Sequence, residues 1–104
     1  RTTLLNARGM GLGLNAGDVF DRTLEVESIE LESQDILFLY SDGITEAMNE
    51  QREEYGEERL MLSASGTDGS DAEKARDTIL ASVSGFLGKT LPQDDQTLVV
   101  VRVL

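Results

Sequence analysis

The strongest constraint on the fold is an unbroken run of five apolar residues, Ile36–Tyr40, with turn-forming residues on both sides. The run follows Ser33-Gln34-Asp35 and ends at Ser41-Asp42-Gly43. A short apolar run between turns is typical of a central β-strand that is covered on both faces. The segment Thr97–Leu104 is rich in β-branched residues and predicts a second strand, which would end the chain.

Helices are expected between these two strands. Apolar residues at helical spacing predict a helix that begins at Ser70 or Asp71, runs to about Leu87 and is closed by Gly88. A shorter helix is expected over 57–62. Upstream, residues 23–27 and 29–32 alternate between polar and apolar in opposite phase, which predicts strand with a bend near Ser28. Strands, then helices, then a final strand favour an α+β fold with a largely antiparallel sheet.

Composition narrows the chemistry that 104 residues in one small domain can perform. Twenty acidic residues against nine basic ones give a net charge of −11, so nucleic acid and anionic membrane surfaces are not expected partners. The chain has no cysteine and no histidine, which excludes thiol nucleophiles, imidazole bases and zinc sites built from either. No apolar run approaches the ~20 residues that span a bilayer. Because the chain opens on Arg1 rather than Met, we expect it to be part of a longer protein.

Two acidic turns are the candidate site. Asp42-Gly43 directly follows the first strand, and Asp94-Asp95 directly precedes the last one. If these strands are antiparallel neighbours, all three carboxylates converge at one rim of the sheet. Oxygen ligands without nitrogen or sulfur favour hard cations such as Mg²⁺ or Mn²⁺. The alternative is that both segments are simple surface turns, since aspartate is a preferred turn residue.

The sequence around these turns resembles that of a known protein family. Four segments are similar, in order and spacing, to motifs of the metal-dependent protein phosphatases (the PPM, or protein phosphatase 2C-like, superfamily): Gly11–Leu14, Leu37–Ala47, Glu54–Leu60 and Asp94–Thr97. The second segment looks like the family's Asp-Gly motif and the last like its closing Asp-Asp-x-Thr motif. The likeness is greatest to the bacterial branch of stage II sporulation and sigma-regulation phosphatases.

The resemblance implies a fold, a reaction and a set of roles. Residues 1–104 would be the C-terminal portion of one PPM-type domain, an αββα sandwich with mainly antiparallel sheets. The reaction would be hydrolysis of phosphoserine or phosphothreonine by water activated at a two-metal Mn²⁺ or Mg²⁺ site. Asp42 and Asp94 match the metal ligands, and Gly43, Asp95 and Thr97 match supporting positions. No catalytic group beyond the metal ligands is implied, and Glu46 is expected to be an exposed acid at a helix start.

The chain also departs from the family pattern. The N-terminal Gly-Asp and Ala-Gly-His motifs are missing, so this chain by itself is expected to hold metal weakly or not at all. Gly17-Asp18 lies in the wrong place and is interpreted as a turn, with the alternative that Asp18 or Asp21 supplies an extra ligand. We therefore expect a parent protein that is a cytoplasmic phosphatase acting on an anti-anti-sigma-like phosphoprotein. We also expect that unpaired sheet edges in the isolated chain favour self-association.

The sequence is also compatible with two other functional interpretations. A catalytically inactive PPM-like module that binds a partner protein is the main alternative, although such a module would have no chemical reason to keep both Asp42 and Asp94. A plain acidic α+β domain without a site would require all four motif matches to be accidental.

Overall fold

The computed structural model describes residues 2–5 and 28–104. Its elements in chain order are β1 (Ile36–Tyr40), α2 (Asp42–Thr45), α3 (Gly56–Ser65), α4 (Ala72–Leu87) and β2 (Leu98–Arg102). The expected α+β class with antiparallel strand pairing is confirmed. Three predictions fall outside the described residues. They concern the glycine-containing segment 11–14, the pair Asp18 and Asp21, and the alternating residues 23–27.

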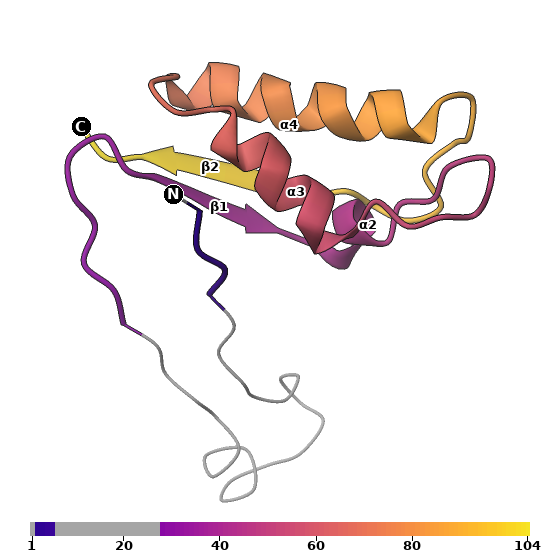
Figure 1. The fold of residues 1–104 in the computed structure, drawn as a ribbon, viewed down its shortest axis with the longest axis horizontal. Coiled ribbons are helices and arrows are strands. Elements are labelled where there is room, and N and C mark those ends of the chain that lie inside the picture. The colour runs from indigo at the N-terminus through magenta and orange to yellow at the C-terminus, as the bar shows by residue number, and fades with distance from the viewer. Residues whose placement is uncertain (1, 6–27) are drawn as a thin grey trace, which may run out of the picture.

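The two strands lie side by side although they are far apart in the sequence. Tyr40 and Leu98, with 57 residues between them, form the last pair of the ladder. Ile36 pairs with Arg102 at the other end, so the end of β1 meets the start of β2 (Figure 1). The prediction of a shared acidic rim depends on this antiparallel pairing of β1 with β2. The αββα sandwich implied by the family resemblance stays a prediction, since the described residues form one two-stranded sheet.

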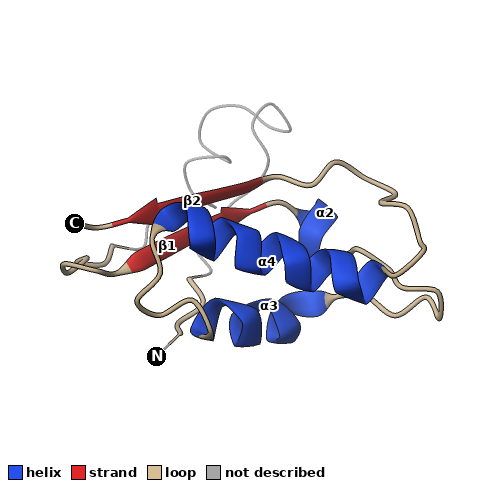
Figure 2. Ribbon diagram, turned by 90° about the horizontal axis from the view of Figure 1, so that it is seen from above, coloured by secondary structure: helices blue, strands red, loops and turns tan. Residues whose placement is uncertain are grey.

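Both long helices cover the same face of this sheet (Figure 2). Phe38, Tyr40 and Leu98 point to that face and pack against the core cluster. On the opposite face Leu39 is 53% exposed and Val99 is 46% exposed. The expectation that β1 is covered on both faces is therefore wrong for the described part of the chain, because α3 and α4 both lie on one side.

Helix α4 forms where its sequence pattern predicts. The Asp71 carboxylate caps its first turn, with Oδ1 accepting a hydrogen bond from the Lys74 backbone N–H at 2.8 Å. Gly88 ends the helix with a positive φ of 61°, which glycine adopts without the steric cost that a Cβ atom would bring. The buried residues of α4 recur every three or four positions and form one stripe against the core: Ala75, Ile79, Val83 and Leu87.

Helix α3 packs across α4 through an aromatic contact. It spans more residues than the predicted 57–62 and is preceded by Tyr55, which is 1% exposed. The Tyr55 hydroxyl lies 2.7 Å from the Ser82 hydroxyl, and the Tyr55 ring meets the Phe86 ring edge to face at 5.5 Å between centroids. The Arg59 guanidinium also lies over the Phe86 ring, 4.5 Å from its centroid.

Two expectations about strands need correction. Residues 29–32 alternate as a strand would, but they are not in a strand, and Ile29 and Leu31 are exposed. Alternation stabilises a strand only where one face is buried, and no described element covers this segment. The predicted last strand, 97–104, is shorter in the structure and spans Leu98–Arg102. Among the described helices, none combines the length and apolar character needed to cross a bilayer.

Candidate metal-binding rim

Asp42 is presented by a short, buried helical turn. Directly after β1 the chain enters α2, in which Gly43, Ile44 and Thr45 are buried while Asp42 remains exposed. The Ile44 side chain is fully buried in the core cluster and fixes this turn to the rest of the domain. A carboxylate on such a turn has a backbone position set by packing rather than by a free loop.

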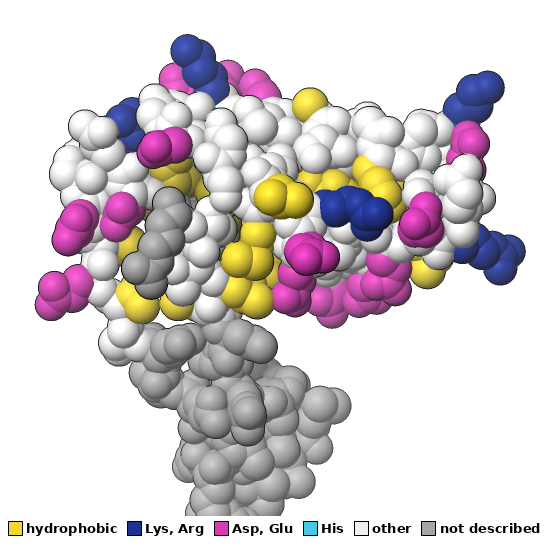
Figure 3. Space-filling model, viewed as in Figure 1, with side chains coloured by type: hydrophobic (Ala, Val, Ile, Leu, Met, Phe, Trp, Pro, Cys, Tyr) yellow, Lys and Arg dark blue, Asp and Glu magenta, His cyan; other side chains and the backbone are white. Residues whose placement is uncertain are grey.

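The surroundings of Asp42 are strongly acidic. Acidic side chains gather over α2 and the start of α3 (Figure 3), where Glu57 and Glu58 occupy the first turn of α3. Burial raises the pKa of the Tyr40 hydroxyl above its ordinary value, and the carboxylates of Glu57 and Asp42 raise it further. Negative charge at this end of the domain therefore favours the approach of cations.

Asp94 and Asp95 lie on the loop before β2, and both are exposed. The Asp94 carboxylate accepts a hydrogen bond from the Asp95 backbone N–H, with 2.8 Å between the two atoms. A shallow open depression is formed by this loop, and its lining consists of Pro92, Gln93, Asp94, Asp95 and Gln96. Unlike Asp42, these two carboxylates are carried by irregular chain.

The two acidic turns are in direct backbone contact. A Cβ atom added to Gly43 would overlap the carbonyl oxygen of Asp95 and lie 2.7 Å from its carbonyl carbon. Ser41 joins the same two segments: its backbone N–H donates to the Thr97 carbonyl, and its hydroxyl oxygen accepts from the Thr97 N–H, both at 3.0 Å. The Asp42 turn and the Asp95–Thr97 segment are thus one packed unit.

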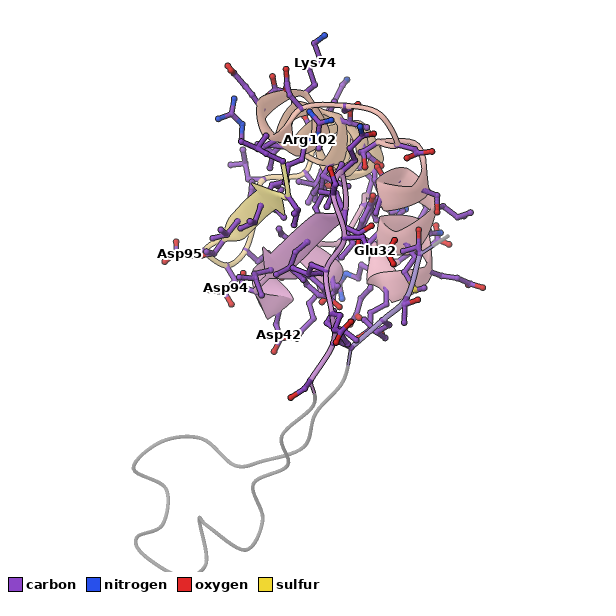
Figure 4. The ribbon with its side chains drawn as sticks, turned by 90° about the vertical axis from the view of Figure 1, so that its left-hand side faces the viewer. Glu32, Asp42, Lys74, Asp94, Asp95 and Arg102 are labelled. Carbon is purple, nitrogen blue, oxygen red and sulfur yellow. The ribbon has the colours of Figure 1, made fainter. Side chains whose placement is uncertain are left out.

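The three carboxylates of the two acidic turns do not form one ligand cluster. Figure 4 shows Asp42, Asp94 and Asp95 on one side of the molecule, away from Lys74 and Arg102, with Asp95 projecting outward from its loop. Within residues 2–5 and 28–104, no group of three or more acidic side chains is arranged to hold a metal ion. The expected grouping of all three carboxylates as metal ligands is therefore not found among these residues, where Asp95 projects outward from its loop.

The donor chemistry at the rim nevertheless fits part of a divalent-cation site. Asp42 and Asp94 offer hard carboxylate oxygens on contacting turns, and such oxygens are the ligands that Mg²⁺ and Mn²⁺ prefer. Two carboxylates are fewer than a tight site needs, so further ligands would have to come from outside the described residues.

Gly43 and Thr97 support the rim through backbone contacts between the two turns. The space left by Gly43 is filled by the Asp95 backbone rather than left open for a ligand. Thr97 joins the two turns through its backbone N–H and carbonyl. Glu46 is exposed as expected, but it follows the last residue of α2 instead of starting a helix. The metal roles of Asp42 and Asp94 stay predictions.

Two residues at the rim were not singled out by the sequence. Ser41 forms more links between the turns than any predicted residue, and only its place before Asp-Gly could have drawn attention to it. The Gln96 side-chain amide nitrogen is enclosed and has no hydrogen-bond partner among the described residues. An enclosed donor of this kind is costly unless it is satisfied, and nothing in the local sequence distinguishes Gln96 from an ordinary surface glutamine.

Comparison with known proteins agrees with the motif resemblance. The model of the family described as "Stage II sporulation protein E (SpoIIE)" matches residues 1–104. The chain is 25% identical to "Protein IcfG" of Synechocystis sp. over 103 residues, which cover 94% of this chain and 16% of IcfG. It thus spans only a small part of the length of that relative. No solved structure matches it.

Proposed function

Because the chain belongs to the stage II sporulation protein E family of PPM-type phosphatases, we propose that it supplies part of the active site of a metal-dependent phosphoserine and phosphothreonine protein phosphatase. The observation that carries the proposal is the contact between the two acidic turns. Residues 54 positions apart, Ser41 and Asp95, are joined there, so Asp42 and the Asp94 loop belong to one rim.

In this proposal some residues of the chain bind the metal and others hold the two turns together. Asp42 and Asp94 would hold Mn²⁺ or Mg²⁺, while Gly43, Asp95 and Thr97 keep the two turns in contact. When bound, such cations neutralise phosphoryl oxygens and lower the pKa of a coordinated water. The acidic surface over α2 and the start of α3 attracts the cations to this end of the domain. The remaining ligands would come from other parts of the full-length protein, within the αββα sandwich that the family resemblance implies.

The proposed substrate is a phosphoprotein of the anti-anti-sigma type in the cytoplasm. The support for this class is the family description, which names a sporulation protein, together with the bacterial-branch motifs. The net charge of −11 adds that the substrate surface facing this segment should not itself be strongly acidic.

A second candidate is a catalytically inactive PPM-like module that binds a protein partner. One observation favours it: the described residues assemble no group of three metal-holding side chains. The presence of both Asp42 and Asp94 on contacting turns favours the enzyme, because a binding module gains nothing from a pair of like charges at a shared rim.

The test is Mn²⁺-dependent hydrolysis of a phosphoserine protein by the full-length protein, comparing the wild type with Asp42→Asn and Asp94→Asn. Each substitution keeps the side-chain shape and removes one charge. We expect a loss greater than about 100-fold in each variant, since removing groups that only support metal ligands already costs about 10–100-fold.

Asp68→Asn is the matched control. Asp68 is also an exposed aspartate followed by glycine, but it lies in the connection between α3 and α4, at the other end of the molecule from α2 (Figure 1). It should retain wild-type turnover. Wild-type turnover in both Asp42→Asn and Asp94→Asn would refute the assignment, and a wild-type protein without Mn²⁺-dependent hydrolysis would favour the inactive module.

A further inference from the structure

Ser41 occupies the junction between the two acidic turns. Its hydroxyl oxygen accepts a hydrogen bond from the Thr97 backbone N–H at 3.0 Å. The same hydroxyl lies 3.4 Å from the Asp95 carbonyl oxygen, to which it donates. A serine hydroxyl has one donor and two acceptor positions, so it can make both bonds at once.

These bonds act where the strand ladder has ended. The last ladder pair joins Tyr40 to Leu98, and both carboxylate-bearing turns lie beyond it. Ser41 immediately precedes Asp42, and its partner Asp95 immediately follows Asp94. One hydroxyl therefore ties the backbone of the two turns together at a distance of one residue from each proposed ligand.

Few other contacts hold the Asp94 loop. Its residues from Leu91 to Asp95 are exposed, and the hydrogen bond of the Asp94 carboxylate is to the neighbouring Asp95 N–H, which fixes no long-range position. Beyond the Ser41 hydroxyl, the described links from the loop to the Asp42 turn are the Ser41 N–H bond to Thr97 and the packing against Gly43.

We propose that Ser41 is a positioning residue, whose hydroxyl sets the separation of the Asp42 and Asp94 carboxylates and thereby the affinity of this rim for divalent metal. This inference rests on the proposed function. It adds a role for a residue that is not a proposed ligand and acts through its hydrogen bonds to the backbone of Asp95 and Thr97.

Two substitutions at Ser41 separate the hydroxyl from the rest of the side chain. Ser41→Ala removes both hydroxyl bonds. Ser41→Thr keeps the hydroxyl and adds a methyl group, which suits the extended backbone of this position (φ −94°, ψ 165°). Ser82→Ala is the matched control, because it also removes a hydrogen-bonded hydroxyl, the partner of Tyr55 at 2.7 Å, but from the contact between α3 and α4.

The experiment measures Mn²⁺ affinity of the full-length protein by calorimetry, with the melting temperature and the amide exchange of Thr97 recorded for every variant. Ser41→Ala should lose about 10-fold or more in Mn²⁺ affinity, the range typical of groups that support metal ligands, and its Thr97 amide should exchange faster. Ser41→Thr should restore both quantities. Ser82→Ala should change the melting temperature and leave Mn²⁺ affinity at the wild-type value.

The outcomes distinguish this inference from the proposed function. If Asp42→Asn abolishes Mn²⁺ binding while Ser41→Ala binds as tightly as the wild type, the positioning role is wrong and the site assignment stands. Equal losses in Ser41→Ala and Ser82→Ala would show a general effect of stability and would also overturn it. If Asp42→Asn binds Mn²⁺ like the wild type, the proposed function fails, and the role of Ser41 fails with it.

Discussion

The dipeptide Asp-Gly occurs twice in this chain, and the two copies do different work. Asp42-Gly43 starts α2 at the acidic rim, and Asp68-Gly69 lies in the connection between α3 and α4. Gly43 is buried and has no room for a Cβ atom because the Asp95 backbone lies against it. Gly69 is exposed with nothing within 4 Å of its Cβ position, and its φ is +79°.

The Asp-Gly dipeptide therefore has two different structural roles in this chain. At position 43 glycine is needed for close approach by a distant segment of chain. At position 69 it is needed for a left-handed backbone, and the turn around it is held by local bonds such as the one from Ser70 N–H to the Thr67 carbonyl at 2.9 Å. Only the first kind brings Asp42 close to another acidic turn, so contact with remote chain distinguishes the candidate site from the ordinary turn.

The largest expected effect is that of Gly43→Ala. Its new methyl group would meet backbone atoms of Asp95, which no rotamer change can move aside, so the two turns must separate. We expect a loss of about 3 kcal/mol or more in the free energy of unfolding, the upper range for overpacking, together with loss of Mn²⁺-dependent turnover. Denaturant titration and the phosphatase assay measure the two effects. If the variant were as stable and active as the wild type, the contact between Gly43 and Asp95 would not be needed, and the distinction between the two Asp-Gly turns would fail.

Ile44→Ala tests whether the Asp42 turn is fixed by the core. Ile44 is fully buried beside Asp42, and removing its side chain should cost about 2–5 kcal/mol of unfolding free energy. Leu62→Ala is the control, since Leu62 is 73% exposed on α3 and should change stability by less than about 0.5 kcal/mol. Equal losses in the two variants, again from denaturant titration, would mean that α2 is not fixed by burial.

Gly69→Ala should have a smaller effect than Gly43→Ala and a different one. Alanine in a left-handed conformation costs about 1–2 kcal/mol, but nothing surrounds its methyl group at this position. Stability should fall by that amount in denaturant titration while turnover per folded molecule stays at the wild-type value. A loss of turnover would show that the second Asp-Gly turn is also functional.

The smallest effect concerns Tyr40 at alkaline pH. Burial and the carboxylates of Glu57 and Asp42 raise its pKa above 10.0, so the folded state favours the protonated hydroxyl. That contribution is fully present below the ordinary pKa and is lost as pH rises through the raised pKa. Tyr40→Phe cannot ionise there, so its stability should fall less steeply than that of the wild type above pH 10.0. Parallel stability curves from denaturation at several pH values would contradict this.

Sequence pattern predicted the elements whose signals are local. The spacing in Ala72–Leu87, the Asp71 cap and the Gly88 ending are all found in the structure, because each depends on residues within a few positions of one another. The apolar run Ile36–Tyr40 also forms its strand, although the burial of both its faces is not found. Residues 29–32 alternate but form no strand, since alternation alone does not supply a partner strand.

The sequence offers candidate residue types for the site but not the geometry of the rim, and the metal roles of those residues stay predictions. Asp42 and Asp94 could be named from motif and spacing. The contact of Gly43 with Asp95, the links made by Ser41 and the outward direction of Asp95 all depend on how β1 and β2 meet, which no local pattern encodes. Tertiary contact therefore determines which acidic residues of this chain can act together.

The central proposal is that Asp42 and Asp94 act together in one divalent-cation site, and a double-mutant cycle on Mn²⁺ affinity tests it most directly. Calorimetry of the full-length protein would compare Asp42→Asn, Asp94→Asn and the double variant, with Asp42→Asn plus Asp68→Asn as the reference pair. We predict that the first pair is non-additive, with a coupling of about 0.5–3 kcal/mol, and that the reference pair adds within about 0.5 kcal/mol. Additive effects of Asp42→Asn and Asp94→Asn would contradict a shared site.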